Sequence, residues 1–269
     1  MGNSHSHVGG NELIFQLVMV MPFLAALVLY FLAVVVSNKR LKKQWSLVRS
    51  TLWVFGIVLA LIAVVGPLAE QAHVDFRAHM VGHVLLGMLV PLLLVLATPM
   101  TLILRTLPVR LARRLTRVLK SLPMQVITNP LFAAFLNIGG LWFLYTTELY
   151  VLMQQSMIIH ILVHIHVFLA GYLFTMSIIY MEPTSHRLSF TYRSIVLVLA
   201  FAAHGILSKY IYAHPPSGIS ASQAEAGGQI MYYGGDLIEL ILIFIFCYQW
   251  YKNARPRGVL LQSYGKEYS

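Results

Sequence analysis

Two pairs of histidines with the same four-residue spacing are the residues of this chain best suited to chemistry. One pair is His79 and His83, in HVDFRAHMVGHVLL, and the other is His160 and His164, in HILVHIHVFLAGYLF. Residues four apart share one face of an α-helix, so each pair can offer two imidazoles to one ion. Imidazole suits copper, zinc, iron and nickel. The spacing therefore predicts a metal site between two helices, with one ion or two ions close together.

Other ligand types lie near the two pairs. Met153 and Met157 fall on the same helical stripe as His160, and thioether sulfur binds Cu(I), so the two methionines resemble an entry path for this ion. Asp75 lies one turn before His79, where it is expected to orient that imidazole through its far ring nitrogen. The other candidates for supporting or alternative ligands are His204, Met231, Asp236 and Glu239.

The composition places these residues in a membrane protein. Of the 269 residues, 58% are apolar and 10% are charged, whereas soluble domains contain about 25% charged residues. Seven stretches each hold about 20 or more mostly apolar residues, enough to cross a bilayer. They cover residues 12–36, 48–67, 77–104, 126–147, 153–180, 193–213 and 229–251. The prediction is an all-α bundle of seven transmembrane helices, with residues 1–269 as one membrane domain.

The basic residues predict the orientation of the bundle. All lysines and arginines except Arg77 and Lys209 fall on one side of the predicted spans. Because cytoplasmic loops are enriched in these residues, the N-terminus is expected outside and the C-terminus in the cytoplasm. Topology and contact with anionic lipid account for the net charge of +10, so nucleic acid is not an expected partner.

With this orientation, the candidate ligands fall in the outer half of the bilayer. At about 1.5 Å of rise per residue, His83 lies about 6 Å below His79, and His204 lies roughly 12 Å below the outer end of its helix. Asp236 and Glu239 are the two carboxylates expected well inside the membrane. No comparable group of polar residues is expected in the cytoplasmic half. The matched depths favour a metal site over a haem, a proton path or a structural hydrogen-bond network.

Three motifs resemble those of the membrane CtaG family. AHMVGHVLLGMLVPLLLVLATPM is similar to the family's H-M-x-x-H opening, HILVHIHVFLAGYLF to its H-x-x-x-H helix, and AEAGGQIMYYGGDL to its A-G-G-x-x-M-aromatic-x-x-G element. They occur in the family's order, over roughly residues 70–245. The chain departs from the family pattern at Gly82, often Gln in the family, and at Thr175 and Tyr232, often Trp.

The resemblance implies a bacterial inner-membrane assembly factor, not an enzyme, that supports the copper supply of a haem–copper cytochrome c oxidase. It implies oxidase subunits as partners and marks His79, His83, His160 and His164 as ligands. We expect Cu(I), held in an adjustable coordination shell that permits transfer. The alternatives are a membrane haem protein or oxidoreductase, and a copper or proton transporter. The sequence does not decide whether the protein forms a homo-oligomer.

Overall fold

The computed structural model describes residues 5–184 and 187–254, and all regular elements in this part of the chain are helical. In a bilayer the backbone must satisfy its own hydrogen bonds, so long apolar runs form helices. The helices are α1 (His5–Leu41), α2 (Leu47–Val64), α3 (Pro67–Ala72), α4 (Phe76–Val84), η1 (Leu85–Leu89), α5 (Val90–Leu96), α6 (Pro99–Thr106), α7 (Val109–Leu119), α8 (Leu122–Ile127), α9 (Pro130–Ala134), η2 (Phe135–Gly139), α10 (Gly140–Thr146), α11 (Leu149–Gln155), α12 (Met157–Ile178), α13 (Phe190–Ala213) and α14 (Ala221–Ala254). The segments η1 and η2 are π-helical.

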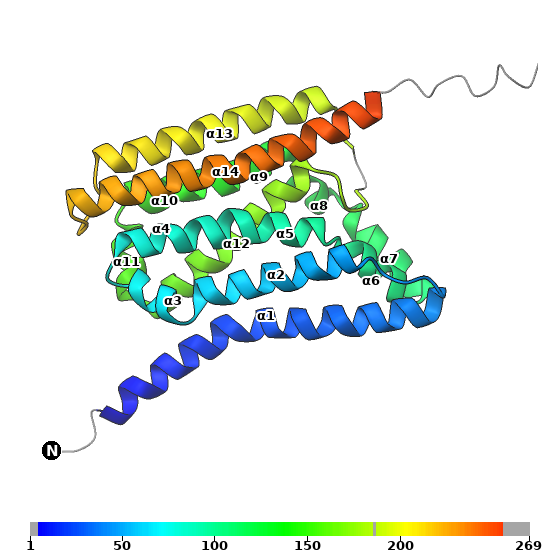
Figure 1. The fold of residues 1–269 in the computed structure, drawn as a ribbon, viewed down its shortest axis with the longest axis horizontal. Helices are drawn as coiled ribbons and strands as arrows, with labels where there is room; N and C mark the ends of the chain where they lie inside the picture. Colours follow the sequence, from blue (N-terminus) through cyan, green and yellow to red (C-terminus); the bar gives the residue numbers. More distant parts are fainter. Residues whose placement is uncertain (1–4, 185–186, 255–269) are drawn as a thin grey trace, which may run out of the picture.

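The long helices run side by side in one bundle, with α1 along one face and α13 and α14 along the opposite face (Figure 1). Six helical segments of the described chain are long and apolar enough to cross a membrane: Gln16–Leu41, Leu47–Val64, Phe76–Leu96, Met157–Ile178, Phe190–Ala213 and Ala221–Ala254. A seventh is reached if Pro130–Thr146 and Leu149–Gln155, which meet at 79°, count as one bent span. The all-helical membrane bundle is confirmed on these terms.

The segment Phe76–Leu96, made of α4, η1 and α5, is the centre of the bundle. Of its 18 most apolar consecutive residues, 67% are buried, against 11% in the first span. The bundle end that contains α3 and α11 is called the α11 end below, and the opposite end, with α6 and α7, is called the α7 end (Figure 1). The central span begins at the α11 end, so α4 places its side chains in the interior close to that end.

The central span ends earlier than the predicted 77–104. Thr98 adopts a left-handed backbone conformation with φ of 53°, and a new helix, α6, starts at Pro99. Proline lacks an N–H and disfavours helical geometry in the residue before it, which explains the break. The start of α6 is held by Glu182, whose carboxylate accepts hydrogen bonds from the backbone N–H of Met100 and of Thr101 and from the Thr101 hydroxyl, at 2.8, 2.9 and 2.7 Å.

The fifth span also differs from its predicted bounds of 153–180. Ser156 is extended, with φ of −127° and ψ of 117°, and separates α11 from α12. Met153 therefore lies on a different helix from His160. Its side chain is buried, whereas Met157 is 39% exposed. The prediction of one continuous stripe of methionine and histidine is wrong, because the chain turns between its first two members.

The α7 end holds more structure and more buried polar groups than expected. The basic connection over 105–125 contains α7 and the start of α8, and the four arginines of α7 recur every three or four residues, as in an interfacial amphipathic helix. Glu182 and Arg193 are both buried there. Buried polar side chains are therefore not confined to the part of the bundle that contains the histidines, and which end faces the cytoplasm stays a prediction. The basic residues after Lys252 lie outside the described residues.

Candidate metal centre

His79 and His83 both point into the bundle from α4 and are 7% and 6% exposed. The helix begins where the Asp75 side chain accepts a hydrogen bond from the backbone N–H of Arg77 at 2.9 Å. The same carboxylate accepts hydrogen bonds from the Arg77 guanidinium. It therefore pairs with Arg77 and caps α4. The expectation that Asp75 orients His79 is wrong, because this pairing turns the carboxylate to the surface.

Tyr145 takes the place expected for Asp75. His79 Nε2 lies 3.1 Å from the Tyr145 hydroxyl, and both side chains are buried. Tyr145 comes from α10, one residue before the first arm of the bent span ends at Thr146. Its position near the end of an apolar run gives no sequence signal that it contacts a histidine 66 residues away. Sequence reasoning therefore missed this contact.

The second predicted pair is stacked. The rings of His160 and His164 have centroids 4.2 Å apart and planes 9° apart. His164 Nδ1 lies 3.0 Å from the His160 carbonyl oxygen, so its N–H can be donated there. The ring of His73, between α3 and α4, has its centroid 5.0 Å from that of His160. Three imidazoles thus follow one another inward from the α11 end, and His73 joins a group in which the sequence had not placed it.

A small cavity unites three of the four predicted ligands. His79, His83 and His164 line it together with Tyr145, and its volume is about 20 Å³. We call it the first cavity. His160 lies behind His164 and does not line it. No group of three or more His, Cys, Asp or Glu side chains in the described chain is close enough, as it stands, to hold one metal ion. Metal binding at the first cavity would therefore require imidazoles to rotate.

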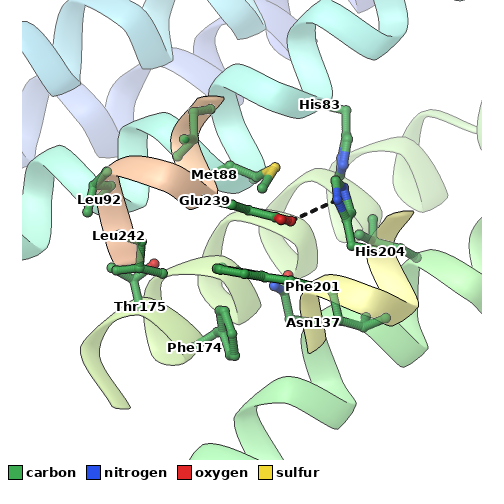
Figure 2. A pocket seen from close by; sticks show the side chains of 15 residues that line it. His83, Met88, Leu92, Asn137, Phe174, Thr175, Phe201, His204, Glu239 and Leu242 are labelled. Atoms are coloured by element: carbon green, nitrogen blue, oxygen red, sulfur yellow. Dashed lines mark ion pairs between the residues drawn. The ribbon is translucent and has the colours of Figure 1, made fainter. Parts of the chain in front are cut away.

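A second buried group lies farther along the bundle. His204 of α13 and Glu239 of α14 are 2% and 7% exposed, and His204 Nδ1 lies 3.0 Å from Glu239 Oε1. They line a second cavity of about 30 Å³ together with Met88, Asn137 and His83 (Figure 2). His83 therefore lines both cavities, and its ring centroid lies 6.4 Å from that of His204.

The remaining two candidate ligands do not join either cavity. Met231 is fully buried and packs in an apolar cluster with Phe76, Met80 and Leu207. Asp236 is on the exposed surface of α14, although Glu239, three residues later, is buried. Three residues rotate a helix by about 300°, so two side chains at this spacing can fall on either side of the boundary of a buried face. Asp236 therefore lies outside both cavities, and its expected depth in the membrane stays a prediction.

Comparison with known proteins gives a family match over most of the chain. Residues 28–253 match the family described as Cytochrome c oxidase caa3 assembly factor (Caa3_CtaG). Uncharacterized proteins of Mycobacterium bovis and Mycobacterium tuberculosis are each 29% identical over 173 residues, covering 62% of this chain and 26% of theirs. An uncharacterized protein of Mycobacterium leprae is 25% identical over 242 residues, covering 82% of this chain and 37% of that protein.

These relatives are much longer than this chain, which spans about a quarter to somewhat over a third of their length. No solved structure matches it. The matched region, 28–253, includes both predicted histidine pairs, both cavities and all spans apart from the start of the first and the last residue of the last. The chain belongs to the cytochrome c oxidase caa3 assembly factor family.

Proposed function

We propose that this protein supports the assembly of a caa3-type cytochrome c oxidase by binding copper, as Cu(I), at the first cavity and passing it to an oxidase subunit. The observation that carries the proposal is the convergence of His79, His83 and His164, from two different helices, on one buried space. Imidazole is a copper ligand, and copper is here the cargo of an assembly step. The role is one of delivery, without catalysis.

The hydrogen bonds around the first cavity suit metal binding. A ligating histidine commonly donates its other ring N–H to a carbonyl or another oxygen, which fixes the tautomer. His164 has such a contact, since its Nδ1 faces the His160 carbonyl, and this leaves Nε2 for an ion. His83 Nε2 is buried and has no hydrogen-bond partner among the described residues. Two imidazoles thus offer a nitrogen that the protein does not already use.

The lack of a ready-made three-ligand cluster is compatible with a transfer site. A carrier must release its ion, so a site that closes by rotating imidazoles around a cavity of about 20 Å³ suits exchange better than a rigid cage. In our proposal the α11 end faces the outside of a bacterial cell membrane, and the imidazoles of His73 and His160 lie along the approach to His164.

Copper content of purified protein tests this function. The wild-type chain, loaded with Cu(I) without oxygen in detergent, is compared with His79→Ala, His164→Ala and the matched control His166→Ala. His166 lies on α12 as well, but its ring contacts the Leu136 carbonyl outside both cavities. We expect less copper in the first two variants and wild-type copper in the control. Equal copper in all four proteins would overturn the proposal, and a Soret band after expression with haem would support the haem alternative instead.

A further inference from the structure

We infer that the second cavity is a separate metal position, at which His83, Met88, His204 and Glu239 bind a soft cation. This inference rests on the proposed function for the identity of the ion, Cu(I). The position lies farther from the α11 end than the first cavity, and the two share His83. The protein would then hold copper at two successive positions, with one imidazole able to turn between them.

The first support is a set of buried polar atoms whose binding capacity the protein does not use. Nε2 of His83 and Nε2 of His204 are both fully buried and have no hydrogen-bond partner in the described chain. Glu239 Oε1 is within ion-pair distance of His204 Nδ1, but it lacks the geometry of a hydrogen bond. Buried polar groups are nearly always satisfied in native proteins, and leaving one unsatisfied costs about 1–3 kcal/mol. Three such atoms around one cavity indicate a site for a ligand.

The second support is the kind of donor that lines the cavity. Figure 2 shows the Met88 sulfur, the Glu239 carboxylate and the His204 imidazole directed toward one another. The cavity volume of about 30 Å³ exceeds the roughly 10–15 Å³ that one water molecule requires, so there is space for an ion. As at the first cavity, the imidazoles must rotate to bring three ligands to one point. Two imidazoles and a thioether favour Cu(I) over Mg²⁺ or Ca²⁺, which prefer oxygen ligands. The carboxylate offsets the charge of the ion inside the bundle.

The third support comes from the backbone around the cavity. Both π-helical segments of the described chain contribute to its lining: η1 supplies Gly87 and Met88, and η2 supplies Asn137 and Ile138. Single-turn π segments are rare and often lie at functional sites, because the extra residue redirects side chains that an α-helix would place elsewhere. Two of them, on different spans, meet at the same cavity.

Close helix packing keeps this arrangement in place. A Cβ atom at Gly171 would overlap the carbonyl oxygen of Gly87 in η1, so only glycine permits this approach of α12. A Cβ atom at Gly235 would lie 2.5 Å from Cε1 of His204, so α14 provides a glycine recess for that imidazole. The side chains are thus positioned by tightly packed backbone.

The distinguishing experiment uses sulfur as the signal of the second position. No methionine or cysteine lines the first cavity, whereas Met88 lines the second. The full chain, loaded with Cu(I) without oxygen, is analysed for copper per chain and by X-ray absorption. We expect two copper ions in the wild type and a copper–sulfur shell. Met88→Leu, which preserves side-chain size, should lose this shell and about half of the copper, and Glu239→Gln should also lose about half of the copper. His164→Ala should lose copper but keep the shell.

Met21→Leu is the matched control, since Met21 is 56% exposed on α1 and should change neither measurement. The inference is overturned if the wild type shows no copper–sulfur shell, or if both Met88→Leu and Glu239→Gln keep all copper. In that case, loss of copper in His164→Ala would still support the first cavity. If His164→Ala keeps all copper and Met88→Leu loses it, the second position stands and the proposed first position fails. A wild-type chain without copper overturns both.

Discussion

Two buried glutamates of the same bundle, Glu182 at the α7 end and Glu239 midway along α14, differ in how many of their hydrogen-bonding positions the protein fills. Glu182 and Glu239 are 3% and 7% exposed, so burial does not separate them. The Glu182 carboxylate accepts three hydrogen bonds from the first residues of α6. The Glu239 carboxylate has the His204 imidazole within 3.0 Å and also lines a cavity. The fold uses the Glu182 carboxylate as a hydrogen-bond acceptor for a helix end, whereas the Glu239 carboxylate keeps an oxygen that can bind a ligand.

The contrast extends to the groups around each carboxylate. The start of α6 offers N–H groups that the helix itself cannot satisfy, and a carboxylate at a helix N-terminus is favoured by both hydrogen bonding and the helix dipole. Around Glu239, the nearest polar neighbours include imidazole nitrogens that also lack partners. A polar cluster that completes a helix end is a structural device, whereas one that leaves several acceptors unused is suited to an exchangeable ligand.

The largest expected effect tests the structural side of this contrast. Glu182→Ala removes the acceptor for three donors at the start of α6, so we expect the free energy of unfolding to fall by about 3 kcal/mol or more. Copper per folded chain should not change. Denaturant unfolding followed by tryptophan fluorescence measures the first quantity, and elemental analysis measures the second. The control is Glu70→Ala, at an exposed position of α3. Wild-type stability in Glu182→Ala would remove the distinction between the two glutamates.

Tyr145→Phe should have the next largest effect, which is a loss of copper affinity at the first cavity. The Tyr145 hydroxyl is the hydrogen-bond partner of His79. Loss of such a partner typically lowers metal affinity by about 10–100-fold. The measurement is a competition titration of the Met88→Leu background with a Cu(I) chelator, so that the first cavity is examined alone.

Tyr150→Phe is the matched control for Tyr145→Phe. The Tyr150 ring also contacts His79, with centroids 5.2 Å apart, but its hydroxyl accepts a hydrogen bond from Gln154. The substitution keeps the ring contact and removes a hydroxyl that does not touch His79. Equal loss of affinity in the two variants would show that the Tyr145 hydroxyl has no special role.

A substitution at Gly235 should act on the second cavity, with a smaller effect. Gly235→Ala places a Cβ atom against the His204 ring and tilts it, so we expect roughly tenfold weaker copper binding there. At Gly234 the added Cβ would meet Val84 at 3.4 Å, an ordinary contact, so Gly234→Ala is the control. The two variants are compared by the size of the copper–sulfur shell in X-ray absorption, with less copper added than would fill both positions. An undiminished shell in Gly235→Ala would contradict the assigned place of His204.

The sequence predicts the bundle well because its strongest signal is the length of apolar runs. Six of the seven predicted spans correspond to single candidate helices, and the remaining one to a bent pair. The ends of spans are less predictable. At Thr98 the chain leaves the helix just before Pro99, and at Ser156 it turns after the polar residues Gln154 and Gln155, but neither signal by itself fixes where a span ends. Helical periodicity therefore connects Met153 with His160, although they lie on different helices.

In the candidate site, too, local features could be predicted from the sequence, whereas contacts between distant helices could not. The spacing of His79 and His83 on one helix is local information, and their shared inward face follows from it. The partners of these histidines depend on how helices rotate and pack, which one sequence does not encode in a readable pattern. His83 approaches His204, 121 residues later, and His79 contacts Tyr145. Two positions at which the chain departs from the family motifs, Gly82 and Thr175, line the first and second cavities respectively.

The smallest expected effect concerns Asp75, which was expected to orient His79. The Arg77 guanidinium beside it, on the protein surface, holds the pKa of the Asp75 carboxyl below its usual value. A lowered pKa means that the contribution of this carboxylate to stability is present above the unfolded value and is lost as the pH falls through the folded value. Asp75→Ala should therefore lower the free energy of unfolding at neutral pH by about 1 kcal/mol, the usual value of an N-cap.

The effect of Asp75→Ala on copper separates it from Tyr145→Phe. Because the Asp75 carboxylate pairs with Arg77 and caps α4, its removal should leave copper affinity at the first cavity unchanged. The free energies of unfolding of the wild type and the variant, measured from pH 7 down to about pH 2, should converge only as the pH falls below the ordinary aspartate pKa of about 3.9, because the pKa of folded Asp75 is lower still. A tenfold loss of copper affinity in Asp75→Ala would restore Asp75 as the residue that orients His79 and would reduce the Tyr145 contact to packing.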